Sequence, residues 1–331
     1  MKNKLPVYVL TMNHFDPTWR RCWRRRFSFK GWTYVSYAEL EDYYMTDNLA
    51  LARRHSEYTF EAESAVVVRE YLRRHPARLA ELRKLSKAGR FAVPGAGDNI
   101  VDTNMPLGES LVRNFVTGLL WVEDNLGRGT RLGIRNDGFG NSAQIPQIFR
   151  GCEIAAVSGF SYSGLPAKFW RGLDGSVVAN AGFVHVGGGG GCDKYAPCPR
   201  CRGKGCHACH GWAIDPSLRS RLPTAINEQT LRENGAGVVM LSPEELLPNP
   251  EIVRWVREQR KMYDVKYALH EEALAHCHWL PHVDDPPAAD VYAGVELNPN
   301  NSGVLVSRIR LKQMCREQEY ALLGAETLWT W

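Results

Sequence analysis

Residues 7–19 read VYVLTMNHFDPTW, so a short apolar run is followed within a few positions by His14 and Asp16. A run of this length and composition predicts a buried strand. Asp137 comes soon after a second strand-like segment, residues 131–134. Ligands of α/β proteins bind beyond the carboxyl ends of strands, and one imidazole with two carboxylates suits zinc or a harder divalent ion. The two segments together predict a metal-dependent hydrolase site.

Strand-like and helix-like segments alternate along the rest of the chain. Strands are predicted at residues 7–11, 91–94, 131–135, 154–157, 176–186, 238–241 and 266–269. Helices are predicted at residues 38–55, 65–89, 109–125 and 250–264, where apolar residues recur every three or four positions. Repeated alternation of this kind predicts an α/β fold with a mainly parallel sheet covered by helices, either open or closed into a barrel.

The composition is that of an ordinary soluble globular protein, with 331 residues, 44% hydrophobic and 23% charged. No apolar stretch reaches the roughly 18 residues that suggest a membrane-spanning helix. No signal-peptide core follows the charged amino terminus, because Asn13 and His14 interrupt the apolar run. We therefore expect a cytoplasmic protein without a membrane partner.

A basic cluster near the start combines two tryptophans, Trp19 and Trp23, with arginines at positions 20, 21 and 24–26. A nucleic-acid surface and a solvated protein face are both compatible with such a cluster. The net charge of +5 is modest for the length. We interpret the cluster as a solvated face and do not expect nucleic acid as a partner.

Four of the nine cysteines form the pattern C-x2-C-x4-C-x2-C, at Cys198, Cys201, Cys206 and Cys209. Two such pairs can place four thiolates around zinc, and the glycines between them permit tight turns. The pattern resembles the repeats of DnaJ-type zinc domains. A site with four protein ligands has no open coordination position, so this zinc is predicted to be structural. Together with the glycine run that precedes it, the motif predicts a zinc-knuckle insertion at residues 187–213.

Three segments in order carry a resemblance to a known family: HFDPTW at 14–19, DTNMPLGESLVR at 102–113 and NDGFGNSAQIPQIF at 136–149. They resemble the amino-terminal domain of glycoside hydrolase family 38, the retaining α-mannosidases. The resemblance implies a seven-stranded irregular β/α barrel of the glycoside hydrolase/deacetylase type over residues 1–300. It also implies that residues 301–331 are the first helix of a helical bundle, apparently truncated.

The same resemblance assigns roles to individual residues. His14, Asp16 and Asp137 would bind a catalytic divalent ion, which is zinc in this family, and Asp137 would also be the nucleophile. Trp19 would form an apolar wall for a sugar ring. The acid/base would be Glu245, or failing that Glu244, where the family has aspartate.

The family's fourth metal ligand is a histidine that lies beyond the helical bundle, and it has no counterpart in this sequence. Four histidines cluster locally, and one of them could substitute: His270, His276, His278 and His282. A downstream domain or a second subunit could also complete the site.

We interpret the chain as an α-mannosidase-like glycosidase domain that hydrolyses terminal α-D-mannosidic bonds in oligosaccharides or glycoconjugates. Two alternatives stay open at this point. HxD ligation on an irregular barrel also serves metal-dependent carbohydrate deacetylases. An inactive hydrolase scaffold could instead bind a partner through the zinc knuckle, whose basic residues include Arg200, Arg202 and Lys204.

Overall fold

The computed structural model describes residues 4–14, 22–29, 32–95, 97–100, 103–104, 106–134, 140–158, 169–180, 183–189, 200–202, 221–223, 225–241, 247–276, 291–293 and 296–297. The helix expected within residues 301–331 and most of the insertion expected at 187–213 lie outside this set. The fold is α/β, as the alternating segments predict.

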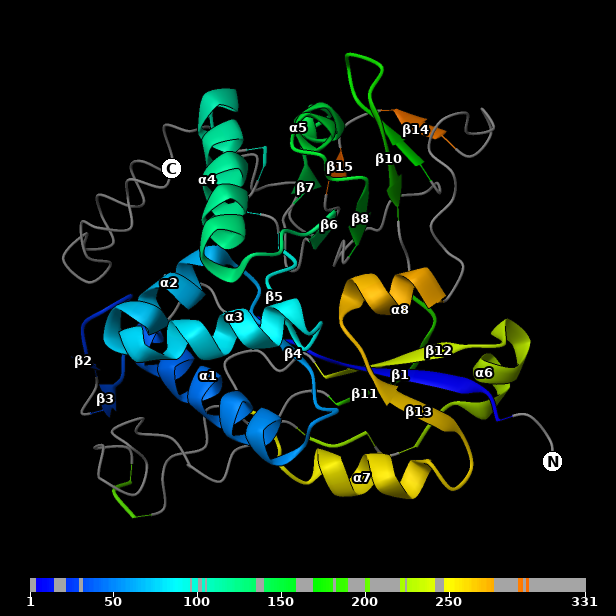
Figure 1. Ribbon diagram of the computed structural model, residues 1–331. Helices are drawn as coiled ribbons and strands as arrows, with labels where there is room; N and C mark the ends of the chain where they lie inside the picture. The colour runs from blue at the N-terminus through cyan, green and yellow to red at the C-terminus, as the bar shows by residue number, and fades with distance from the viewer. Residues whose placement is uncertain are drawn as a thin grey trace.

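A four-stranded sheet is built around the segment that opens the chain. Its order is β11-β12-β1-β13, and every neighbouring pair is parallel (Figure 1). The strands are β1 (Pro6–Thr11), β11 (His185–Gly189), β12 (Gly237–Leu241) and β13 (Asp264–Tyr267). The strands predicted at 7–11 and 238–241 are confirmed. The insertion was expected to begin at Gly187, but its first three glycines belong to β11, where they pair with β12.

The described helices are α1 (Tyr37–Arg54), α2 (Ala65–Arg74), the 3-10 helix η1 (Pro76–Arg78), α3 (Leu79–Lys87), α4 (Gly108–Leu126), α5 (Ile145–Gly151), α6 (Glu228–Asn234), α7 (Ile252–Gln259) and α8 (His270–His276). The single helix predicted at 65–89 is wrong in one respect, because it breaks between α2 and η1. Pro76 has no backbone N–H and disfavours a helical conformation at His75, so the chain turns there.

The two faces of β1 pack against different helices, because successive side chains of a strand point to opposite sides. Val7 and Val9 lie in the main hydrophobic cluster together with residues of α1 and α7. Tyr8 and Leu10 pack on the other side, with Ala273 of α8. Figure 1 accordingly shows α7 and α8 on opposite sides of this sheet.

A second, five-stranded sheet has the order β14-β9-β10-β8-β6. Its strands are β6 (Leu132–Ile134), β8 (Ala156–Ser158), β9 (Phe169–Arg171), β10 (Val177–Asn180) and β14 (Val291–Ala293). Only the β9–β10 pair is antiparallel. One strand was predicted at 176–186, but two are found there, because β10 pairs in this sheet while β11 pairs with β12. The intervening Gly182 is a residue typical of turns.

Three two-stranded pairs complete the described strands: β2 (Phe27–Phe29) with β3 (Trp32–Tyr34), β4 (Phe60–Glu61) with β5 (Phe91–Ala92), and β7 (Gly140–Asn141) with β15 (Glu296–Leu297).

Short contacts connect the two larger sheets through β4 and β5. A parallel bridge joins Met12 to Glu61 of β4, and β4 pairs in parallel with β5. The Ile134 N–H in β6 then donates to the Pro94 carbonyl, at 3.0 Å. The described strands thus follow one another in a curved series from β11 to β10. The closed seven-stranded barrel is not seen among the described residues, because β10 and β11 belong to different sheets.

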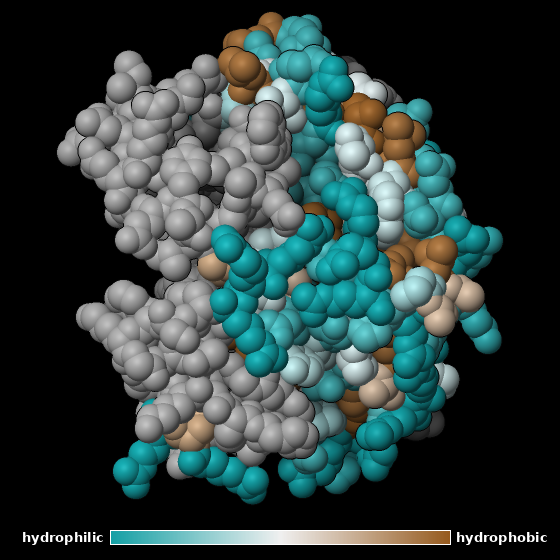
Figure 2. All heavy atoms as spheres, turned by 90° about the vertical axis from the view of Figure 1, so that its left-hand side faces the viewer, coloured by the Kyte–Doolittle hydropathy of each residue, from teal (hydrophilic) through white to brown (hydrophobic). Residues whose placement is uncertain are grey.

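An apolar interior lies between the two sheets. Met12 packs there with residues of β6, β8 and β10 and with Leu274 of α8. The coloured part of the face shown in Figure 2 is mainly hydrophilic, with small separate apolar patches. Among the described residues, no helix is long and apolar enough to cross a membrane.

Candidate metal centre and active site

His14 lies three positions after the end of β1 and is 6% exposed. The bridge between Met12 and Glu61 places the chain after β1 beside the chain after β4. His14 and Glu63 each lie two residues beyond that bridge, and His14 Nδ1 is 2.7 Å from Glu63 Oε2. Parallel pairing therefore brings together two polar residues that are 49 positions apart in the sequence.

Glu63 controls the chemical form of the His14 ring. Its side chain is almost fully buried, and an ionised carboxylate can only accept hydrogen bonds. With an ionised Glu63, the proton between the two groups is carried by His14 Nδ1. A neutral ring then has no proton on Nε2, and this is the tautomer that binds a metal through Nε2.

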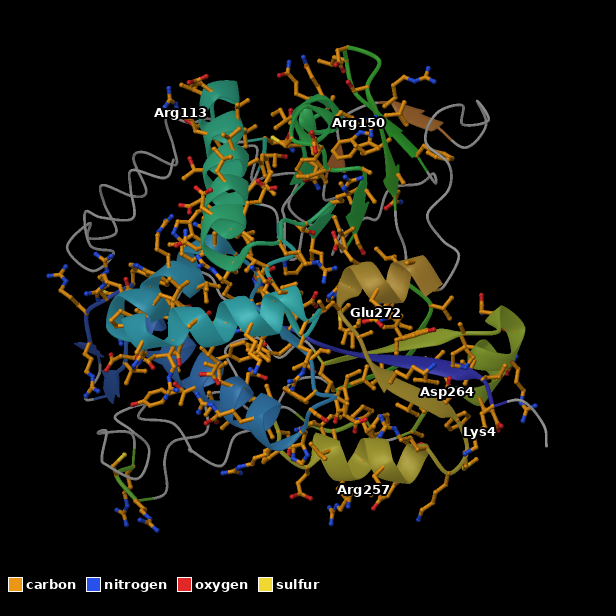
Figure 3. All side chains as sticks on the ribbon, viewed as in Figure 1. Lys4, Arg113, Arg150, Arg257, Asp264 and Glu272 are labelled. Atoms are coloured by element: carbon orange, nitrogen blue, oxygen red, sulfur yellow. The ribbon has the colours of Figure 1, made fainter. Side chains whose placement is uncertain are left out.

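A third buried group, Glu41 of α1, stands close to this pair. Asn13 Nδ2 donates a hydrogen bond to Glu41 Oε2 over 3.4 Å. Burial raises the pKa of the Glu41 carboxyl well above its usual value, and the negative charge of Glu63 adds to the rise. The hydrogen bond from Asn13 and the electrostatic interaction with His14 oppose it. In contrast to these buried groups, the side chains of Arg113 in α4 and Arg257 in α7 point away from the sheets (Figure 3).

A second imidazole–carboxylate pair lies two positions earlier on the same strand segment. Glu61 Oε1 accepts from the His270 backbone N–H at 3.0 Å, and Glu61 Oε2 contacts His270 Nδ1. Both side chains are 1% exposed. The Phe183 ring packs edge-on against the His270 ring, with centroids 5.3 Å apart. Glu61 thus holds His270 at the start of α8.

Of the histidines suggested as a substitute ligand, His270 is the one whose surroundings are described. Its Nε2 atom is buried and has no hydrogen-bond partner among the described residues. The side chain of His276, and all of His278 and His282, lie outside that set.

The structure also joins two of the three motifs that carry the resemblance. Thr103 belongs to the second motif, and its hydroxyl accepts from the Ser142 backbone N–H of the third motif at 2.8 Å. The same hydroxyl donates to Asn141 Oδ1 over 3.4 Å. Thr103 and Asn141 are both buried. The second motif therefore braces the turn that follows the Asp137 segment.

Most of the predicted site residues lie outside the described set: Asp16, Trp19, Asp137, Glu244, Glu245, Cys198, Cys206 and Cys209. In the sequence, Asp137 follows the end of β6 and Glu245 follows the end of β12. Cys201 is partly buried and packs against the main hydrophobic cluster. Among the described residues alone, no three histidine, cysteine or acidic groups come together as a metal site.

Sequence reasoning missed the buried glutamates Glu41, Glu61 and Glu63. The segment Phe60-Glu61-Ala62-Glu63 places two acids on one face of a buried strand end, and this pattern was a usable signal. Acids are rarely buried unless they are paired, so acids within a strand-like segment indicate partners elsewhere in the fold.

Residues 4–160 match the model of the family described as "Glycosyl hydrolases family 38 N-terminal domain". The amino-terminal part of the chain is therefore similar to family 38. The family 38 segment contains His14, Glu63 and all three motifs of the resemblance.

Curated relatives agree with this assignment. Alpha-mannosidase 2C1 of Homo sapiens is 31% identical over 140 residues, which are 39% of this chain and 13% of that protein. Alpha-mannosidase of Saccharomyces cerevisiae is 28% identical over 189 residues, 52% of this chain and 16% of that protein. The chain thus aligns with less than a fifth of the length of either relative.

A solved structure extends the likeness in fold beyond the family 38 segment. The crystal structure of an alpha-mannosidase from Enterococcus faecalis V583 superimposes with a TM-score of 0.62. The match covers 88% of this chain and 31% of that chain, at 16% sequence identity. At this identity the likeness establishes the fold alone.

Proposed function

We propose that this chain provides the catalytic domain for metal-dependent hydrolysis of terminal α-D-mannosidic bonds in oligosaccharides or glycoconjugates, with retention of anomeric configuration. The observation that carries the proposal is the buried His14 of the family 38 segment, held by Glu63 beyond the end of β1. A carbohydrate hydrolase needs such a polar group at the edge of the sheet, and the fold alone does not require one.

The proposed ligands of the catalytic ion are His14, Asp16 and Asp137. One imidazole and two carboxylates form a set that suits zinc, and since Glu63 contacts Nδ1, Nε2 is the nitrogen of His14 that would bind the ion. When bound, zinc would supply positive charge that holds vicinal sugar hydroxyls. A downstream domain, or a second copy of the chain, would provide the remaining ligand.

The proposed chemistry uses two carboxyl groups of this chain. The Asp137 carboxylate attacks the anomeric carbon while the glycosidic C–O bond breaks, and Glu245 gives its proton to the leaving oxygen. A water molecule then attacks the anomeric carbon of the resulting ester, and Glu245 takes the water proton. Asp137 is released and the configuration is retained. A separation of about 5–5.5 Å between the two carboxyl groups is expected for this mechanism.

Two further parts of the proposal concern support of the site. Trp19 would lie against the apolar face of the sugar. The four cysteines Cys198, Cys201, Cys206 and Cys209 would hold a second, structural zinc. The series of described strands would close into a barrel around the site.

Cleavage of a chromogenic α-mannoside, followed by NMR detection of the first anomer released, tests the proposal. We expect the α-anomer to appear first, and a chelator to stop turnover. Asp137→Asn should reduce turnover to background while the thermal transition is kept, because the amide preserves shape but is a poor nucleophile. The matched β-mannoside should not be cleaved. Turnover that survives Asp137→Asn would overturn the assignment of the nucleophile.

A further inference from the structure

We propose that Glu63 is a positioning residue for the catalytic metal: it fixes the tautomer and the orientation of His14 so that Nε2 is the metal-binding atom. This inference rests on the proposed function, since it takes His14 as a ligand. It adds a residue that lies outside the three motifs of the resemblance.

The first argument is the satisfaction of hydrogen bonds. Glu63 is 2% exposed, and its Oε2 atom is paired with His14 Nδ1. Its Oε1 atom has no hydrogen-bond partner among the described residues. Burying a carboxylate that is only half satisfied opposes folding. Among the described residues, the contact with His14 Nδ1 is thus the hydrogen bond that offsets the cost of burying the Glu63 carboxylate.

The second argument is rigidity. A Cβ atom added to Gly95 would lie only 2.0 Å from the Glu63 carbonyl oxygen, so the chain after β5 approaches the Glu63 backbone closely. The Ala62 N–H, one residue earlier, donates to the Ala92 carbonyl at 3.1 Å. Glu63 is therefore held by its backbone on one side while its side chain holds His14 on the other.

The third argument is chemical. A histidine that binds a metal through one ring nitrogen usually donates the other ring N–H to a carboxylate or carbonyl, which orients the ring and increases its basicity. The contact between Glu63 Oε2 and His14 Nδ1 has this form. Loss of such a partner typically weakens metal binding by about 10- to 100-fold.

Glu61 provides a matched control within the same strand segment. It is as buried as Glu63 and also contacts a histidine Nδ1, but that histidine is His270, at the start of α8. Glu61→Gln and Glu63→Gln therefore make the same chemical change at neighbouring positions. Only the second change removes the carboxylate from the predicted ligand.

The experiment measures Co²⁺ binding to the metal-free full chain and to three variants: Glu63→Gln, Glu61→Gln and His14→Ala. Cobalt bound by thiolates absorbs strongly in the near ultraviolet, so the four-cysteine site is distinguished from a nitrogen and oxygen site. We expect His14→Ala to abolish the nitrogen and oxygen site, and Glu63→Gln to weaken it by about 10- to 100-fold. This inference takes His270 as a structural residue and not as the substitute ligand, so Glu61→Gln should leave the affinity unchanged.

The possible outcomes separate this inference from the function on which it rests. If His14→Ala binds Co²⁺ like the unchanged chain, the proposed metal centre is wrong. If His14→Ala abolishes binding but Glu63→Gln does not weaken it, the metal centre stands and the role of Glu63 is wrong. Equal weakening by Glu61→Gln and Glu63→Gln would also overturn that role, because the effect would then come from general disturbance of the strand.

A measurement on the unchanged chain keeps the inference testable even if Glu63→Gln does not fold. ¹⁵N NMR of the metal-free protein with labelled histidines reports which ring nitrogen of His14 carries the proton. We expect a protonated Nδ1 and a bare Nε2, with the resonance assigned by its loss in His14→Ala. A bare Nδ1 would contradict the proposal directly.

Discussion

Glu61 and Glu63 lie on one face of the same short segment and each contacts a histidine, but the two pairs serve different parts of the molecule. Glu61 uses both oxygens on His270, one on the backbone N–H and one on the ring, and so it ties α8 to β4. Glu63 uses one oxygen on His14. The first pair resembles a helix cap made within the core, whereas the other Glu63 oxygen has no hydrogen-bond partner among the residues that the structure describes. In our proposal the same carboxylate–histidine pairing is structural at Glu61 and functional at Glu63.

The largest loss of stability that tests this comparison is expected from Glu61→Ala. The change leaves a buried backbone N–H and a buried ring N–H without acceptors, and loss of one member of a buried pair costs about 3–5 kcal/mol where the remaining group is charged. Urea unfolding of the metal-free chain, followed by circular dichroism, measures the loss. Glu63→Ala should lower the free energy of unfolding by clearly less in the same assay. Equal losses would show that the two pairs are equally structural and would remove the contrast.

A smaller effect is expected from Gly95→Ala, which acts on the Glu63 pair through the backbone. The new methyl group would clash with the Glu63 carbonyl oxygen, and overpacking of this kind costs about 1–3 kcal/mol. Because the clash displaces Glu63 and leaves Glu61 alone, Co²⁺ affinity should fall together with stability. Gly151→Ala is a matched control, since a Cβ atom there meets nothing within 4 Å. Unchanged cobalt affinity in Gly95→Ala would show that the Glu63 backbone can move without consequence.

The smallest effect is a dependence on pH that involves Glu41, the third buried acid. Burial raises the pKa of Glu41 in the folded chain, so its contribution to stability is fully present below the unfolded pKa and is lost as pH rises toward the folded pKa. For one such group the slope is at most about 1.4 kcal/mol per pH unit. Glu41→Gln stays neutral at every pH, so it should flatten the decline of stability above the unfolded pKa. Urea unfolding of both metal-free chains across that pH range makes the comparison, and parallel curves would contradict the prediction.

Local sequence was sufficient for the features that depend on near neighbours. Residues 7–11 and 238–241 form parallel strands because their apolar and β-branched side chains suit a strand buried on both faces. Helix α4 ends at Leu126, one residue after the predicted end, and Gly127, with a φ of +73°, terminates it. Local periodicity failed at Pro76, where one helix-breaking residue outweighs the pattern around it.

For the candidate site, too, some features could be predicted from local sequence and others could not. The sequence alone indicated a family and a set of chemical groups, through the motifs at 14–19, 102–113 and 136–149. Residues 4–160 match the model of that family. The hydrogen-bond partners of those groups could not be predicted from the sequence. His14 and Glu63 meet only because parallel pairing brings the chains after β1 and β4 side by side. The same holds for Glu61 and His270, which are 209 positions apart.

The sequence by itself determined the α/β alternation, the main strands and the chemical types of the proposed centre, because these follow from side-chain periodicity and motif spacing. Only the tertiary structure decided which carboxylate holds which histidine. Strand register and burial set those contacts, and both depend on residues that are distant in the sequence.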